Sequence, residues 1–303
     1  MEEWAYTGEV AALVTAGCWT VTALAFESAG KRVGSLAVNF IRLVIALCIL
    51  SVFCWIRLGV AFPVDADGHT WLWLAISGLV GFTVGDLCLF RAFVVVGARV
   101  SMLLMALVPP FTALIGWSIL GETLQTREWI GMALTVAGVV WVILERRPRS
   151  EDEHRVGVSG RVRGVLLGLG GAVGQAVGLV LSKYGMGETM DPFAATQIRI
   201  VAGAAGFAIL FAIIGWWPKV VAGLKNRAAM ARISLGAVFG PFLGVSLSLV
   251  AVRYTETGVA ATIMAIVPVL IIVPSILIKK ERVSPRAVLG AVTAVTGVGI
   301  MFV

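Results

Sequence analysis

The chain has 303 residues, of which 59% are hydrophobic and 14% are charged, and its mean hydropathy is +0.98. A soluble domain carries about 25% charged residues, so this composition excludes a water-soluble globular fold. The net charge of +7 would suit a nucleic-acid-binding protein, but the Lys and Arg lie in short loops between apolar runs. This placement indicates membrane topology, so we expect no nucleic-acid partner and a multi-pass protein of the cell (inner) membrane.

Ten apolar runs follow one another along the chain. About 20 apolar residues cross a bilayer as a helix, and strand-like alternation is absent, so each run is predicted as a transmembrane helix of an all-α protein. In chain order the predicted spans are residues 8–26, 35–56, 71–90, 98–120, 128–144, 164–182, 193–215, 233–252, 258–278 and 285–303. The longest polar segment, residues 145–163, lies between the fifth and the sixth span.

The two halves of the chain repeat one another. The stretch MALVP at residues 105–109 matches MAIVP at residues 264–268, which lies 159 residues further on. The same offset relates Glu122 to Glu281, Arg127 to Arg286, Gly131 to Gly290, Gly138 to Gly297, Gly81 to Gly240 and Gly85 to Gly244. Arg42 and Arg199 match at an offset of 157. A repeat of this size indicates two homologous units.

Each unit holds five spans, which is an odd number. The second unit must therefore enter the membrane in the opposite direction, and the predicted fold is ten transmembrane helices arranged as two inverted five-helix repeats. We place the first repeat at residues 1–147, a linker at 148–162 and the second repeat at 163–303. Inverted repeats are related by a pseudo-two-fold axis in the membrane plane, and their substrate sites lie between the halves.

The paired MALVPP and MAIVP stretches, the Glu that follows each and the glycine-spaced closing span of each half resemble the drug/metabolite transporter superfamily. Specifically, the chain is similar to its ten-helix EamA type, and Trp19 fits the aromatic residue often found in the first span of that family. The resemblance implies export or exchange of a small organic metabolite, often an amino acid or a related compound, by alternating access. Membrane lipid is then the surrounding partner, and no ATPase subunit is implied.

The membrane orientation receives two opposite predictions. Of the 24 Lys and Arg residues, 18 fall in the loops after the odd-numbered spans and 4 in the loops after the even-numbered spans. Because positively charged loops stay in the cytoplasm, the charges place both termini outside. The family resemblance implies both termini inside, and we favour the charges.

Charged residues within spans are costly and are functional candidates by default. Asp86 is the one acid well inside an apolar run. It could take up a proton, bind a cationic substrate group, or form a fixed ion pair with Arg42 or Arg91. A pair with Arg91 on the same helix is geometrically poor, because five residues turn the helix by about 140°. Arg42 and Arg199 are expected to have structural or gating roles, and Arg91 to lie near the mouth of the cavity or the end of its span.

Pro109 and Pro268 lie inside matched spans, where each removes a helical hydrogen bond. Such breaks in inverted repeats indicate the substrate site, so the fourth and ninth spans are expected to line the cavity. Apolar candidates for its wall are Trp19, Phe82, Met102, Met105, Trp117 and Met264. Polar candidates are Asn39, Thr83, Gln175, Gln197, Ser246 and Thr262, although such residues often only connect helices. Glu122 and Glu281 are interpreted as helix-end or loop contacts and not as catalytic acids.

Enzymatic activity is not predicted. The two histidines, His69 and His154, fall in loops, and no metal-ligand spacing, nucleophile motif or phosphate-binding loop is present in the sequence. We expect no cofactor and no metal, and transport driven by a gradient of an ion or substrate that the sequence does not identify. The oligomeric state is left open. The alternatives are a flippase for a lipid-linked carrier and a membrane scaffold that transports nothing.

Overall fold

The computed structural model describes residues 6–145, 158–274 and 284–302, and no strand is present among them. The first half comprises α1 (Thr7–Val33), α2 (Ser35–Leu58), α3 (Gly68–Gly78), the π-helix η1 (Leu79–Gly85), α4 (Asp86–Met105), α5 (Val108–Leu120) and α6 (Thr126–Glu145). The second half comprises α7 (Val158–Met186), α8 (Pro192–Ile214), α9 (Trp217–Lys225), α10 (Arg227–Ala237), the π-helix η3 (Val238–Gly244), α11 (Val245–Tyr254), α12 (Thr257–Met264), α13 (Val267–Leu270) and α15 (Pro285–Met301).

Eight helical stretches of the described residues are long and apolar enough to cross a membrane, and α5 and α15 add two shorter apolar helices. Together they occupy the ten predicted positions, so the ten-span, all-α prediction is confirmed. The predicted linker at 148–162 is described only from residue 158, where α7 already begins, and the predicted end of the ninth span at residue 278 lies outside the described residues.

Helix ends follow ordinary capping chemistry. Asp191 accepts hydrogen bonds from the backbone N–H groups of Phe193 and Ala194 at 2.9 and 3.2 Å, and Pro192 occupies the first helical position of α8. Both features suit a helix start, because the first N–H groups have no partner inside the helix. Gly59, Gly121 and Gly215 end α2, α5 and α8 with positive φ, a conformation that glycine adopts without steric cost.

The internal repeat is visible in local backbone structure. The π-helices η1 and η3 occupy residues 79–85 and 238–244, which are again 159 positions apart. Two-residue breaks at Ala106-Leu107 and Ala265-Ile266 share this offset, and the helices that follow carry Pro109 and Pro268 in their first turn. The break that we predicted beside each proline is therefore present. The sequence analysis did not predict the π-helices.

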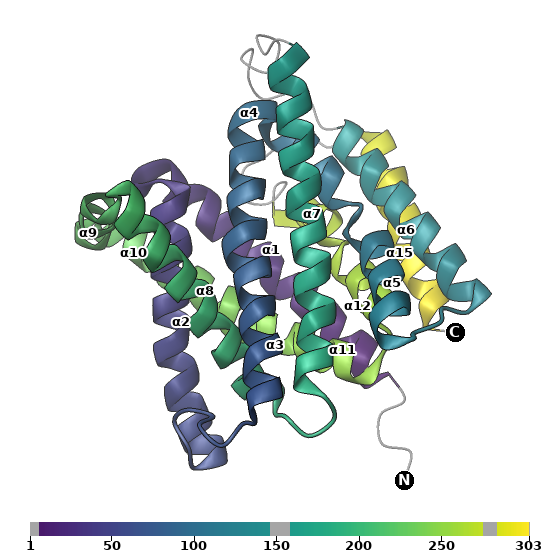
Figure 1. Ribbon diagram of the computed structural model, residues 1–303. Coiled ribbons are helices and arrows are strands. Elements are labelled where there is room, and N and C mark those ends of the chain that lie inside the picture. Colours follow the sequence, from purple (N-terminus) through teal and green to yellow (C-terminus); the bar gives the residue numbers. More distant parts are fainter. Residues whose placement is uncertain (1–5, 146–157, 275–283, 303) are drawn as a thin grey trace.

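The two closing helices, α6 and α15, pack side by side and run antiparallel (Figure 1). Their contact, which we call the seam, joins Gly131, Thr135 and Gly138 of α6 to Gly297, Ala294 and Gly290 of α15. A Cβ atom on Gly131 would lie 2.7 Å from the Gly297 carbonyl oxygen, and one on Gly138 would lie 2.6 Å from that of Gly290. Since Gly131 matches Gly290 and Gly138 matches Gly297, the contact is reciprocal, as a two-fold axis requires. This geometry confirms two inverted repeats.

The chain reverses direction within α4. Val96 packs against Gly164 of α7, and Leu89 packs against Gly171, so this part of the chain runs antiparallel to α7. A straight helix would carry Leu104 about 12 Å beyond Val96, at 1.5 Å per residue. Leu104 instead packs against Gly168, back along α7. The third and fourth spans are therefore separate crossings, although a single helical assignment covers the turn between them.

Each half's first helix packs against the π-helix of the other half. Gly174 and Gly178 of α7 lie against Gly85 and Gly81 of η1, where a Cβ on either α7 residue would come within 3.0 Å of a glycine Cα. At the matched contact, Gly244 of η3 lies against the Trp19 side chain of α1. Small residues permit such close approach of helix backbones. This exchange of first helices brings residues of both halves around one central space.

The outer surface carries large apolar side chains, as a lipid-facing surface should. Ile56, Ile213 and Trp117 are 78%, 77% and 63% exposed. The prediction that Trp117 lines a central cavity is therefore wrong. The short helix α9, which the sequence analysis had assigned to a loop, follows Trp216, and Lys219 lies 3.5 Å from the centre of that indole ring.

Candidate functional site

A cavity of about 350 Å³ lies between the two halves. Its lining comes from both repeats: α1, α2, η1, α4, α5 and α6 belong to the first, and α7, α8, η3, α11, α12 and α13 belong to the second. The lining residues are Trp19, Thr22, Ala23, Arg42, Phe82, Asp86, Leu89, Met102, Met105, Ala106, Val108, Val139, Gln175, Leu179, Arg199, Gly240, Pro241, Val245, Ser248, Ala261, Met264, Ala265, Val267 and Pro268.

Matched positions of the repeat meet at this cavity. Phe82 and Pro241 lie at the same place in η1 and η3, and both line the space. Pro241 has no backbone N–H, so it favours the irregular hydrogen bonding of η3. The breaks that precede Pro109 and Pro268 also reach the cavity, through Ala106 and Ala265. The wall is thus built where the helices of both repeats depart from regular geometry.

Asp86 and Arg42 form an ion pair across the cavity wall. The Arg42 guanidinium donates a hydrogen bond to Asp86 Oδ2, and the two side chains are 14% and 9% exposed. Gln175 Nε2 donates a second hydrogen bond, of 3.2 Å, to Asp86 Oδ1. The Arg42 guanidinium carbon also lies 5.3 Å from the centre of the Phe26 ring. Of the two arginines considered for Asp86, the structure selects Arg42, and it places Arg91 at the exposed surface.

Arg199 also lines the cavity, but it has no such partner. The residue is 5% exposed, and its guanidinium carbon lies 5.1 Å from the centre of the Phe82 ring. Its Nε is buried without a hydrogen-bond partner among the described residues, and no carboxylate of those residues forms an ion pair with it. The two arginines that the repeat relates therefore differ in their surroundings.

The structure brings ten of the predicted site residues to the cavity: Trp19, Arg42, Phe82, Asp86, Met102, Met105, Gln175, Arg199, Met264 and Pro268. Whether these side chains contact substrate stays a prediction. Sequence reasoning missed Thr22, Pro241, Val245 and Ser248. The offset of 159 could have found Pro241 and Val245, because they match the candidates Phe82 and Asp86.

Six other predicted site residues lie away from the lining: Asn39, Thr83, Pro109, Gln197, Ser246 and Thr262. Three of them make hydrogen bonds to neighbouring backbone: Thr83 donates to the Gly203 carbonyl at 3.2 Å, Gln197 to the Ala61 carbonyl at 2.8 Å, and Thr262 to the Gly258 carbonyl at 2.7 Å. Uncharged polar side chains in lipid commonly stabilise helix contacts in this way. Asn39, Pro109 and Ser246 are buried outside the cavity.

A polar network joins the halves at the end of the molecule where α1 begins and α15 ends. We call this end the terminal side; the rings of Tyr6 and Phe302 lie 5.8 Å apart there. Lys183 Nζ donates to Glu122 Oε1 at 2.7 Å and to the Thr255 carbonyl at 2.9 Å. Thr257 Oγ1 donates to Glu122 Oε2 at 2.5 Å. This terminal-side network connects the ends of α5 and α7 to the loop between α11 and α12, so the interpretation of Glu122 as a loop contact is confirmed; Glu281 lies outside the described residues.

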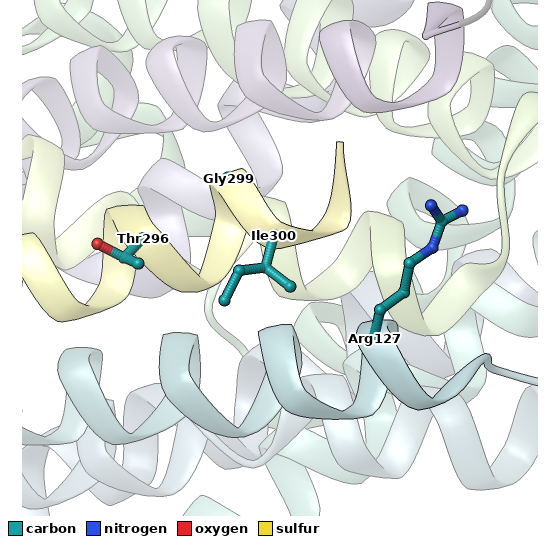
Figure 2. A pocket seen from close by; sticks show the side chains of 4 residues that line it. All are labelled: Arg127, Thr296, Gly299 and Ile300. Atoms are coloured by element: carbon teal, nitrogen blue, oxygen red, sulfur yellow. The ribbon is translucent and has the colours of Figure 1, made fainter. Parts of the chain in front are cut away.

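A second hollow, of about 540 Å³, lies between the start of α6 and the end of α15 (Figure 2). Arg127, Thr296, Gly299 and Ile300 line it, and in Figure 2 the Arg127 side chain extends away from Thr296. Small-molecule sites combine an apolar lining with several converging polar groups. This hollow has one charged group beside a largely apolar surface, so it lacks that feature. We therefore take the central cavity as the candidate site.

Comparison with known proteins agrees with this architecture. The model of the EamA-like transporter family matches residues 6–144 and again residues 162–303, one match for each repeat. The chain belongs to the EamA-like transporter family. A Sinorhizobium sp. protein described as an uncharacterized transporter in the cobO 3' region is 30% identical over 129 residues, which are 43% of this chain and 91% of the relative. A solved structure titled only as the crystal structure of a protein superposes with a TM-score of 0.76 at 18% identity and covers 97% of this chain and 96% of its own.

The family and the transporter-named relative identify this chain as a membrane transporter of the drug/metabolite transporter type. Both names point to a transporter rather than an enzyme. The solved structure shares its fold with this chain at low identity, so it adds support for the architecture alone.

Proposed function

We propose that this EamA-family protein is a secondary transporter that exports or exchanges a small organic metabolite, with amino acids and related compounds as the first candidates. The observation that carries the proposal is the cavity of about 350 Å³ enclosed by matched elements of two inverted repeats. Its volume lies within the range of small-molecule sites, about 300–1,000 Å³. In inverted-repeat transporters the substrate binds between the halves.

The mechanism that we propose is alternating access. The terminal-side network links the two halves through Glu122, Lys183 and Thr257, and these bonds favour a state that is closed at that end. Opening toward the terminal side would break them. The seam between α6 and α15 would stay intact during this movement, because separating the two helices would lose the close backbone contacts at its glycines.

We further propose that a gradient of an ion or of a second substrate drives transport. The sequence carries no ATP-binding motif. Charged side chains within a span are costly, and here Asp86 and two arginines border the cavity. Asp86 is the candidate for coupling, because it is the carboxylate in the lining and it already accepts hydrogen bonds from Arg42 and Gln175.

The experiment that tests this function has two stages. First, the purified full chain is screened against amino acids and other metabolites, and binding is read as an increase in melting temperature. Second, each stabilising compound is loaded into proteoliposomes and counterflow of the labelled compound is measured. We expect at least one stabilising compound to show saturable counterflow. Stabilisation by several compounds without counterflow of any of them would contradict a transporter.

The orientation can be tested with charge-neutral substitutions on the two sides. Thr189 is exposed on the terminal side and Ala222 is exposed in α9 on the opposite side, where most of the described Lys and Arg residues lie. From the positive-inside rule we propose that the terminal side faces outward. A membrane-impermeant thiol reagent added to intact cells should then label Thr189→Cys and spare Ala222→Cys, in a background whose own cysteines are replaced. The reverse labelling would place both termini in the cytoplasm.

A further inference from the structure

The cavity contains two related arginine sites, and only one of them is complete. In the first half, Arg42 on α2 pairs with Asp86 on α4, and Phe26 lies against the guanidinium at 5.3 Å. In the second half, the repeat places Arg199 on α8, and Phe82 from η1 of the first half lies against its guanidinium at 5.1 Å. The position that matches Asp86, 159 residues further on, is Val245. Val245 also lines the cavity, so the second site has the cation and the aromatic ring but lacks the carboxylate.

An unpaired guanidinium at this depth is expensive to maintain. Arg199 is 5% exposed, and its buried Nε has no hydrogen-bond partner among the described residues. The contact with the Phe82 ring compensates only in part, since a cation–π contact contributes about 0.5–2 kcal/mol. A buried cation that lacks a protein counter-ion but borders a cavity is a binding site for an anion that enters the cavity.

We propose that the substrate carries a carboxylate, and that this carboxylate binds Arg199 in the place that Asp86 occupies beside Arg42. This inference rests on the proposed function, because it names the substrate class of the same cavity. The planar guanidinium offers paired donors that match a carboxylate. The ligand thus supplies the group that the second repeat lacks.

The charge of the lining limits the substrate further. Arg42 and Asp86 neutralise one another, which leaves one net positive charge, on Arg199. A ligand with a single negative charge balances it, whereas a phosphate monoester brings a charge of about −1.5 to −2 at neutral pH. Apart from Thr22, Gln175 and Ser248, the remaining wall is apolar, with Met102, Met105 and Met264 among its members. We therefore commit to a monocarboxylate with an apolar body.

A test that needs no ligand places the missing carboxylate in the protein. In Val245→Asp the new side chain should pair with Arg199 as Asp86 pairs with Arg42. We expect the full-length variant to melt about 3 °C above Val245→Asn, the matched neutral control. In an Arg199→Gln background this advantage should disappear. If Val245→Asp melts below Val245→Asn while Arg199 is present, Arg199 is not available to an anion and the inference fails.

A second test compares ligands that differ only in charge. 3-Phenylpropionate, hexanoate and indole-3-acetate are each paired with their primary amide, and binding to the full chain is measured by melting shift. We expect at least one acid to bind at least about tenfold more tightly than its amide, because the charged hydrogen bond is lost in the amide. Arg199→Gln should abolish this preference, and Arg91→Gln, the same change at an exposed arginine, should keep it. Equal binding of acids and amides, no binding of any acid, or a preference that survives Arg199→Gln would overturn the proposal.

The two proposals fail in different ways. A neutral or cationic metabolite that shows counterflow in liposomes, with unchanged rate in Arg199→Gln, refutes the carboxylate site and leaves the transporter intact. A carboxylate that binds through Arg199 but shows no counterflow refutes the transporter and leaves the anion site intact.

Discussion

The two halves of the molecule meet in two very different places. At the seam, α6 and α15 approach so closely that a Cβ atom on Gly138 would lie 2.4 Å from the Ala294 backbone nitrogen. At the cavity, the halves enclose about 350 Å³ and expose an ion pair and a lone arginine to it. The same pseudo-two-fold relation therefore has two results. It produces the close-packed seam where glycines of α6 and α15 face each other, and it produces the cavity where the helices of both repeats break. This contrast suggests that the seam holds the repeats together while the cavity changes shape.

The largest effect is expected at the polar contact of the cavity. In Asp86→Asn, Arg42 loses its counter-ion while it remains buried, and breaking a buried pair from one side costs about 3–5 kcal/mol. We expect a strong loss of thermal stability, measured by the melting temperature of the purified protein, and loss of counterflow activity.

The control for this effect is the double variant Arg42→Gln/Asp86→Asn, which removes both charges. It should recover a substantial part of the stability lost in the single variant, because no unpaired charge remains. A double variant whose loss of stability equals the sum of the two single losses would mean that the pair contributes little and that another interaction holds Arg42.

The seam should respond to size rather than to charge. In Gly138→Ala the new methyl group must displace the backbone of α15, and overpacking of this kind costs about 1–3 kcal/mol. Gly299→Ala on α15 is the matched control, since a Cβ there meets no atom within 4 Å and alanine favours the helix. We expect a lower melting temperature for the first variant and an unchanged or raised one for the second. Equal effects would show that the seam tolerates separation.

The sequence was sufficient for the fold because the repeat is explicit in it. MALVP and MAIVP gave the matched helix breaks, and five spans per unit gave the inversion. The π-helices η1 and η3 could not be predicted in the same way, because a π-turn arises from a local change of hydrogen bonding and not from a hydrophobic period. The sequence related the glycines at 81 and 85 to those at 240 and 244, but the helix form around them needed coordinates.

The candidate site was predicted only in part, and the chemistry of the side chains explains which residues were placed wrongly. The charged residues well inside spans, Arg42, Asp86 and Arg199, line the cavity, because burial of a charge requires a special environment. Both matched breaks also reach it, although Pro109 itself does not. Uncharged polar residues such as Gln197 and Thr83 do not line it, because each can satisfy its hydrogen bonds with a neighbouring helix. Sequence alone does not say which helix a hydroxyl or an amide will face. The unequal partners of Arg42 and Arg199 could have been found, because the offset already related Asp86 to Val245.

The smallest predicted effect concerns the balance between the open and closed states. Thr257→Val removes the 2.5 Å hydrogen bond to Glu122 Oε2 and keeps the shape of the side chain. Loss of one hydrogen bond costs about 1 kcal/mol, and this shifts a two-state equilibrium about fivefold toward opening at the terminal side. The readout is the rate at which a membrane-impermeant thiol reagent, applied from the terminal side, labels Ser248→Cys in the cavity wall.

We expect this labelling rate to rise about fivefold in Thr257→Val if opening precedes labelling, since the rate then follows the open population. Thr293→Val is the control for the loss of one threonine hydroxyl, because the 3.0 Å hydrogen bond from Thr293 to the Leu289 carbonyl lies within α15 on its exposed face, away from the network. A rate that rises equally in both variants would indicate general loosening of the fold. An unchanged rate in Thr257→Val would mean that the terminal-side network does not control access to the cavity. The cavity would then have to open through a different set of contacts.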